Sequence, residues 1–287
     1  MESLIYVKFF LVLGLLIVNC IFSGLWFMKR RQAMVVDVVS HSVLPMLVLA
    51  YLFVGNLHSV FFVIVSLVCS FLVAVCVSFL SKLNLKESQQ IMGVFFSGLF
   101  ALGIILVNIY AKSVHLDADS VLFGALEFSV FEDLYLFSTN IGPVAFYKMA
   151  MLLILNVLTY KYFNPLFSLF SFDAKMLHLK GFNINWIDVF HLAILTFNII
   201  FAFEVVGVVL TLALNVLPLM VARFYAFSSL KLLESAIMIS FVCLVFSSLI
   251  AFSFSLSLSA VFVVFMFALL MLHVLFFDRL SLFKKTI

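Results

Sequence analysis

The stretch AMVVDVVSHSVLPMLVLAYLFV, residues 33–54, decides the fold class of this chain. It is predominantly apolar, and at about 1.5 Å per helical residue it is long enough to cross a hydrocarbon core of about 30 Å. Comparable apolar runs recur along the chain, roughly at 4–28, 58–80, 91–111, 143–163, 184–206, 207–222, 232–254 and 257–277. The sequence therefore predicts an all-α polytopic membrane protein with little mass outside the bilayer.

The composition of the whole chain supports this prediction. Of its 287 residues, 67% are hydrophobic and 10% are charged, whereas soluble domains have about 45–50% apolar and about 25% charged residues. The net charge of +3 is spread over loops rather than gathered in one stripe, so no nucleic-acid partner is expected. The cysteines all fall within apolar runs and are expected to be reduced core residues: Cys20, Cys69, Cys76 and Cys243.

The segment 184–222 is too long for one straight crossing. It contains Gly207 and Pro218, so a broken or doubled helix is expected there. The stretch after Gly207 is short for a full crossing, and the sequence is compatible with eight or nine transmembrane helices. Asn198 and Asn215 in the same segment are expected to hydrogen-bond between helices.

The distribution of lysine and arginine predicts the orientation, because short cytoplasmic loops are enriched in both. With the N-terminus outside and nine crossings, most of the 16 basic residues face the cytoplasm, including those in 29–31, 82–86 and 172–181. The loop at about 112–135 would then be extracytoplasmic. It carries a group of acidic residues: Asp117, Asp119, Glu127, Glu132 and Asp133.

Asp37 and His41 are ionisable residues inside a membrane-spanning run, which makes them candidates for a functional site. Their i, i+4 spacing places them on one helix face, and Pro45 weakens the backbone hydrogen bonding one turn later. A carboxylate and an imidazole on one face suit manganese, ferrous iron or zinc. They could equally bond to each other or to neighbouring helices, and the spacing alone does not separate the two interpretations.

Two other acidic residues, Glu204 and Asp188, also lie in apolar runs. A buried carboxylate such as Glu204 is costly unless it is paired, protonated or metal-bound. Glu204 therefore belongs either to a metal path or to a helix–helix hydrogen bond. Asp188 and His191, three residues apart at the start of their run, are expected to form an interfacial polar pair.

Four stretches resemble the metal-permease family of ABC importers, the membrane subunits of zinc, manganese and iron uptake systems. DVVSHSVLP (37–45) resembles the family signature DAxSHxxLPG, with Met46 in place of the glycine. HLDADSVLFGALEF (115–128) and AFEVVGVVLTLALNVLPLMVAR (202–223) resemble motifs of the manganese-type branch. FDAKMLHLKG (172–181) resembles the family's FDPxxAxxxG, and the four stretches occur in family order.

This resemblance implies one transmembrane permease domain over residues 1–287, with the fold of an ABC importer permease and no enzymatic activity of its own. The cargo would be a divalent metal cation, manganese first, with no permanently bound cofactor. ATP would be hydrolysed on a separate ATP-binding subunit, and an extracytoplasmic metal-binding protein would deliver the metal. A second permease subunit, identical or paralogous, would complete the assembly in the bacterial plasma (inner) membrane, with a metal path lined by Asp37, His41 and Glu204.

The resemblance also implies that 172–181 is a coupling segment, a short helix that docks on the ATP-binding subunit. By its chemistry Asp173 suits an N-cap and Gly181 suits the end of a helix. An ordinary interfacial amphipathic turn is the alternative. The residues implied in coupling are Phe172, Asp173, Lys175, Met176 and Gly181.

Other functions compete with the importer on the sequence alone. A secondary transporter working without an ATPase would be expected to carry internal repeats, and none is convincing. An intramembrane metalloenzyme would be expected to carry HExxH or another dense ligand set, which His41 lacks in its neighbourhood. Within the importer family, zinc or iron competes with manganese, because ligand chemistry hardly separates these ions.

Overall fold

The computed structural model describes residues 2–30, 32–56, 59–83, 88–111, 133–136, 139–226 and 228–284. This part of the chain contains eight helices that are long and apolar enough to cross a membrane, and it confirms the predicted all-α polytopic fold. They are α1 (Glu2–Lys29), α2 (Ala33–Val54), α3 (Val60–Leu83), α4 (Ser88–Leu106), α7 (Val144–Phe172), α9 (Ile184–Ala222), α10 (Ser229–Phe254) and α11 (Leu258–Lys284).

Short elements connect these helices. The π-helix η1 (Val107–Ala111) continues α4, and α8 (Ala174–Leu179) joins α7 to α9. Strands β1 (Asp133–Leu136) and β2 (Thr139–Pro143) form an antiparallel pair just before α7. Residues 112–132 of the acidic loop lie outside the described residues, so its extracytoplasmic position stays a prediction.

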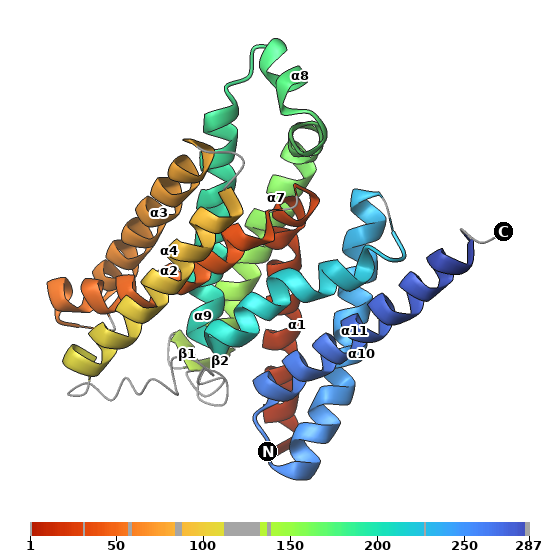
Figure 1. The fold of residues 1–287 in the computed structure, drawn as a ribbon. Coiled ribbons are helices and arrows are strands. Elements are labelled where there is room, and N and C mark those ends of the chain that lie inside the picture. Colours follow the sequence, from red (N-terminus) through yellow and green to blue (C-terminus); the bar gives the residue numbers. More distant parts are fainter. Residues whose placement is uncertain are drawn as a thin grey trace.

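Helix α9 is broken at Gly207, as the sequence predicts. Gly207 has φ 77° and ψ 176°, a positive φ that glycine adopts without a steric penalty. The two halves of α9 leave this point in different directions (Figure 1). The start of α9 is tied to the end of α1 through Arg30 and Asp188. The start of α10 follows shortly after the end of α9. It also contacts the end of α1, because Lys29 donates a hydrogen bond to Ser229. Because both ends of α9 lie near the end of α1, the chain turns back at the break in α9.

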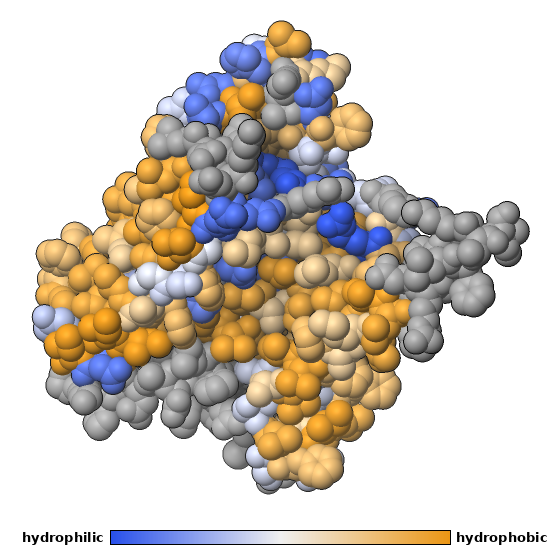
Figure 2. All heavy atoms as spheres, viewed as in Figure 1, coloured by the Kyte–Doolittle hydropathy of each residue, from blue (hydrophilic) through white to orange (hydrophobic). Residues whose placement is uncertain are grey.

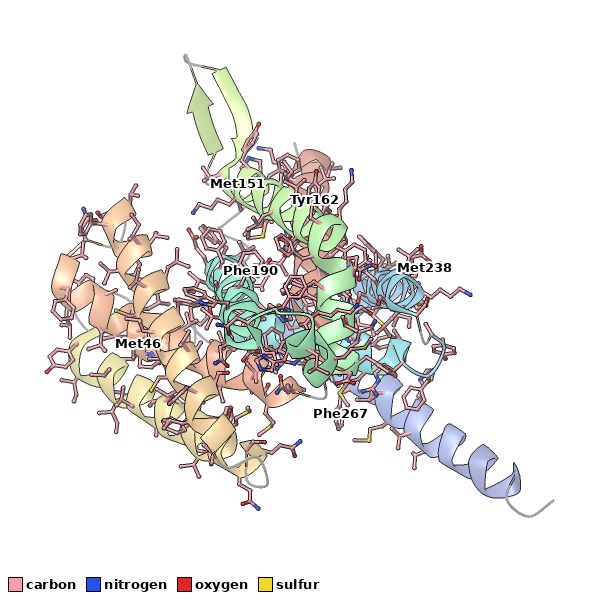
Figure 3. The ribbon with its side chains drawn as sticks, turned by 90° about the horizontal axis from the view of Figure 1, so that it is seen from above. Met46, Met151, Tyr162, Phe190, Met238 and Phe267 are labelled. Carbon is pink, nitrogen blue, oxygen red and sulfur yellow. The ribbon has the colours of Figure 1, made fainter. Side chains whose placement is uncertain are left out.

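Helices α1 and α9 form the centre of the bundle. In an 18-residue apolar window of α9, 78% of the residues are buried, against 22% in the corresponding window of α3 and 17% in that of α4. Helices α3 and α4 are therefore peripheral, and their outer faces are apolar because they face lipid. Large apolar side chains also point outward elsewhere, as Met151, Tyr162 and Met238 show (Figure 3). In Figure 2 hydrophobic residues cover the middle of the visible face, and hydrophilic residues gather towards its upper part.

Buried asparagines connect the central helices. Asn156 of α7 donates to Asn19 of α1 at 2.9 Å and to Asn198 of α9 at 2.7 Å. Asn215, in the second half of α9, accepts a hydrogen bond from Ser23 of α1 at 2.7 Å. The predicted interhelical role of Asn198 and Asn215 is confirmed, and α1 holds both halves of the broken helix. The four cysteines are free, but Cys76 is exposed rather than buried, because α3 is peripheral.

Candidate metal-path site

Helix α2 places Asp37 and His41 on one face, one turn apart, and both side chains are half-buried. The helix continues through Pro45, which is buried one turn after His41. Helix α2 packs against α3, α4 and the central α9, so the pair lies within the bundle rather than at a free helix end. The shared helix face predicted from the i, i+4 spacing is confirmed.

Two phenylalanines of α4 determine where the imidazole of His41 lies. The ring centroid of His41 is 4.5 Å from that of Phe96 and 4.9 Å from that of Phe100. The interplanar angles are 90° and 85°, the edge-to-face arrangement that aromatic rings prefer. The two ring contacts with α4 thus fix the orientation of the His41 imidazole.

Gly103 allows α4 to approach α2 this closely. A Cβ atom at Gly103 would lie 2.1 Å from Cδ2 of Leu44 and 3.1 Å from Cδ of Pro45. Both residues follow His41 within a little more than one turn, so the contact supports the segment of α2 that carries the ionisable pair. Gly103 was not among the predicted site residues. A glycine inside an apolar run was the available signal, since small residues let membrane helices approach closely.

Glu204 lies on α9, three residues before the break at Gly207, and forms an ion pair with Lys148 of α7. The side chain of Glu204 is 48% exposed and that of Lys148 is 33% exposed. The charge of the Glu204 carboxylate is therefore compensated by Lys148 of a neighbouring helix. This agrees with the predicted helix–helix contact, with an ion pair in place of a neutral hydrogen bond. A contact between Glu204 and metal stays a prediction. Lys148 was missed, although a lysine within an apolar run was a usable signal.

The candidate ligands do not form one complete site within a single chain. Among the described residues, no group of three His, Cys, Asp or Glu side chains comes together to hold a metal ion. Asp37 and His41 provide one carboxylate and one imidazole, whereas zinc sites in proteins have about four ligands. A complete site therefore needs donors from outside this pair.

The predicted coupling segment forms a short helix at one end of the molecule (Figure 1). Asp173 caps α8, because its Oδ1 accepts a hydrogen bond from the backbone N–H of Met176 at 3.1 Å. Gly181 follows the helix with φ 84°, a conformation that favours glycine. Phe172 is 93% exposed and Met176 is 46% exposed. The side chain of Lys175 lies outside the described part of the chain.

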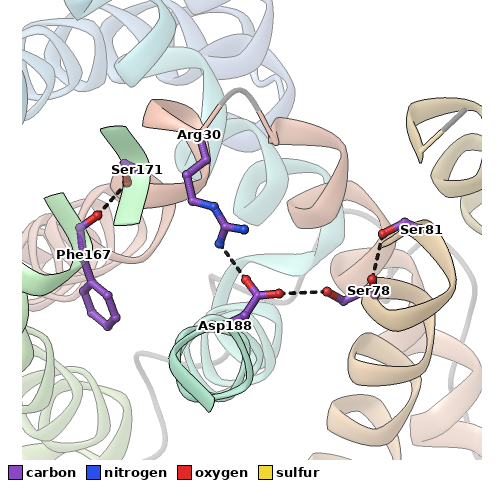
Figure 4. A network of polar contacts seen from close by, with 6 residues as sticks. All are labelled: Arg30, Ser78, Ser81, Phe167, Ser171 and Asp188. Carbon is purple, nitrogen blue, oxygen red and sulfur yellow. Dashed lines mark hydrogen bonds and ion pairs between the residues drawn. The ribbon is translucent and has the colours of Figure 1, made fainter. Parts of the chain in front are cut away.

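Asp188 and His191 are both buried in the bundle, and an interfacial polar pair stays a prediction. Asp188 Oδ1 lies 2.6 Å from Nη1 of Arg30, which follows α1 (Figure 4). The ring of His191 stacks on Phe27 of α1, with centroids 4.2 Å apart. Each side chain therefore contacts α1 or the residue that follows it, because α9 lies at the centre of the bundle.

The chain matches the model of the ABC 3 transport family over residues 4–278. It belongs to the ABC 3 transport family. It is 32% identical over 201 residues to the manganese transport system membrane protein MntD of Bacillus subtilis (strain 168). It is 28% identical over 201 residues to the zinc transport system membrane protein TroD of Treponema pallidum (strain Nichols). Each match covers 70% of this chain, and it spans 68% of MntD but only 54% of TroD.

A solved structure shows the same fold. The structure of PsaBC from Streptococcus pneumoniae in complex with Fab matches with a TM-score of 0.72 at 17% sequence identity. The match covers 93% of this chain and 90% of the solved chain. The predicted ABC transporter permease fold is therefore confirmed for this family member.

Proposed function

We propose that this chain is the membrane permease subunit of an ABC importer for a divalent metal cation, with manganese as the first candidate. The observation that carries the proposal is the half-buried pair of Asp37 and His41 on one face of a membrane-spanning helix, in a chain of the ABC 3 transport family. The names of relatives support the cargo, because MntD is a manganese transport protein. Zinc is the second candidate, because TroD is a zinc transport protein.

The Asp37–His41 pair suits a transient site. A transport site must bind strongly enough to admit the ion and weakly enough to release it. One oxygen and one nitrogen donor from each chain provide half of a four-ligand set, and a second permease subunit, identical or paralogous, would supply the rest. Glu204 is a further candidate donor, and it would have to exchange Lys148 for the metal.

The exposed apolar residues around α8 suit a protein partner. Phe172, which ends α7, is 93% exposed, and Leu179, which ends α8, is 86% exposed; α8 is too short to span a membrane. Large apolar groups exposed to water mark interaction sites, because burying them on a partner is favourable. We assign this surface to a separate ATP-binding subunit, which would hydrolyse ATP and switch access to the site.

The remaining components follow from this role. The assembly would lie in the bacterial plasma (inner) membrane, with α8 in the cytoplasm. A metal-binding protein on the opposite side would deliver the ion. The permease itself would be no enzyme, and the metal would be its cargo rather than a resident cofactor.

The substitution Asp37→Asn tests the metal site, because it removes the charge while keeping the size and most of the hydrogen bonding. Uptake of manganese would be measured in proteoliposomes that contain the permease, its ATP-binding subunit and the metal-binding protein. We expect a fall on the order of tenfold or more, which is a loss of about 1.4 kcal/mol of transition-state or ground-state binding. Competition by zinc in the same assay ranks the two metals.

Glu234→Gln is the matched control, since it makes the same chemical change at an exposed position on α10. It should leave uptake unchanged. Near wild-type uptake by Asp37→Asn, in protein that inserts and binds its ATP-binding subunit, would return the pair to a role in helix packing.

A further inference from the structure

Arg30 follows the end of α1, but its side chain is turned into the bundle and is 11% exposed. Its Nη1 atom lies 2.6 Å from Oδ1 of Asp188, and the Asp188 side chain is 4% exposed. Ser78 of α3 donates to the other oxygen of the same carboxylate at 3.2 Å (Figure 4). One carboxylate at the start of α9 therefore connects the end of α1 with α3.

The same arginine also contacts α7. The guanidinium carbon of Arg30 lies 4.1 Å from the centroid of the Phe170 ring, near the end of α7. Helix α7 ends at Phe172 and α9 begins at Ile184, so these two helices flank α8 on either side. Arg30 thus contacts both helices that carry the coupling segment.

A second contact of the same three helices lies about one turn further along α9. The His191 ring stacks on Phe27 of α1 at 4.2 Å and on Phe167 of α7 at 4.8 Å, with interplanar angles of 23° and 20°. His191 is 2% exposed, so this stack is part of the core. The ion pair and the stack together hold the ends of α1 and α7 and the start of α9 as one unit.

The ion pair is a stiff link because of where it lies. Separating two charges in a buried environment leaves each uncompensated, and this costs far more than separating an exposed pair. The pair should therefore stay closed while the surrounding helices move. In the sequence, α2 begins at Ala33, three residues after Arg30. Asp37 lies in the second turn of α2.

We propose that Arg30 and Asp188 are positioning residues that transmit the movement of α8 to the Asp37–His41 pair. This inference rests on the proposed importer function. A force on α8 displaces the end of α7 and the start of α9 together. The ion pair passes this displacement to the α1–α2 connection and so to the face that holds the metal. Without the pair, ATP hydrolysis continues and its coupling to transport is lost.

The test compares ATP hydrolysis and manganese uptake in the same proteoliposomes, containing the permease with its ATP-binding subunit and metal-binding protein. Arg30→Met combined with Asp188→Leu removes both charges and so leaves no unpaired charge to prevent folding. We expect ATP hydrolysis within twofold of wild type and at least a fivefold fall in metal transported per ATP. Exchanging the residues, Arg30→Asp with Asp188→Arg, should recover most of the coupling.

Arg223→Gln is the matched control, since Arg223 is an exposed basic residue at the other end of α9 and should keep wild-type coupling. Wild-type metal transport per ATP in the Met–Leu variant would overturn the inference. A parallel fall of hydrolysis and transport, with no gain from the exchanged pair, would overturn it as well and show a purely structural pair. Absence of uptake by the wild-type complex would instead refute the importer function, and this inference with it.

Discussion

Replacing Gly24 by alanine should destabilise the bundle. The loss of stability should be larger than for the same change at Gly98 or Gly103. A Cβ atom at Gly24 would lie 2.1 Å from the backbone oxygen of Asn215, in the second half of α9. Carbon–oxygen contacts are comfortable from about 3.3 Å, so α1 and α9 would have to separate locally by about 1.2 Å. A backbone oxygen cannot rotate away, and the helices themselves must move.

The cost can be estimated from the contacts that this movement breaks. Overpacking of this kind costs about 1–3 kcal/mol. The neighbouring hydrogen bond from Ser23 to Asn215 is 2.7 Å long and would stretch beyond bonding distance, which adds about 1 kcal/mol. A total of about 2–4 kcal/mol corresponds to a fall in Tm of roughly 3–7 °C for a chain of this size.

The assay is thermal unfolding of the detergent-solubilised protein, followed with a thiol-reactive fluorescent dye. Cys20 and Cys243 are buried and free, so they react only when the bundle opens. Cys69 is half-buried and Cys76 is exposed, so both are replaced by serine in every variant, including the reference. The dye signal then reports the loss of core packing around α1 and α10.

Two further glycines calibrate the result. A Cβ atom at Gly98 would meet nothing within 4 Å, so Gly98→Ala should be neutral or stabilising. At Gly103 the nearest atom is the end of the Leu44 side chain, which can rotate, so Gly103→Ala should have an intermediate effect. A Tm for Gly24→Ala within about 2 °C of the reference would refute the reasoning, as would an equal loss for Gly98→Ala.

The coupling segment and the orientation provide two more predictions. Replacing residues 175–179 by glycine and serine should leave the permease inserted but release the ATP-binding subunit, because α8 loses its helix and its apolar contacts; full co-purification with continued uptake would contradict this. Cysteines placed singly at Asp119 and Lys175 should differ in labelling by a membrane-impermeant reagent in intact cells, with label at 119 and none at 175. The reverse pattern would overturn the predicted orientation.

The sequence by itself determined the membrane-spanning segments of this protein. Apolar runs of spanning length predict helices, because in the bilayer the backbone of such a run must satisfy its hydrogen bonds within the segment. The break at Gly207 and the cap at Asp173 were also predictable, since both depend on local backbone chemistry. The shared face of Asp37 and His41 follows from helical spacing alone.

Only the tertiary structure decided which helix faces meet. In a soluble protein the apolar face of a helix points inward, but a membrane helix is apolar all round, so periodicity does not reveal its packed side. The sequence therefore places Arg30 among loop cations and Asp188 beside His191, whereas the structure pairs Arg30 with Asp188. The ion pair of Glu204 with Lys148 and the close approach at Gly24 have the same origin. Each joins residues far apart in the chain, and each involves α9, which lies at the centre of the bundle.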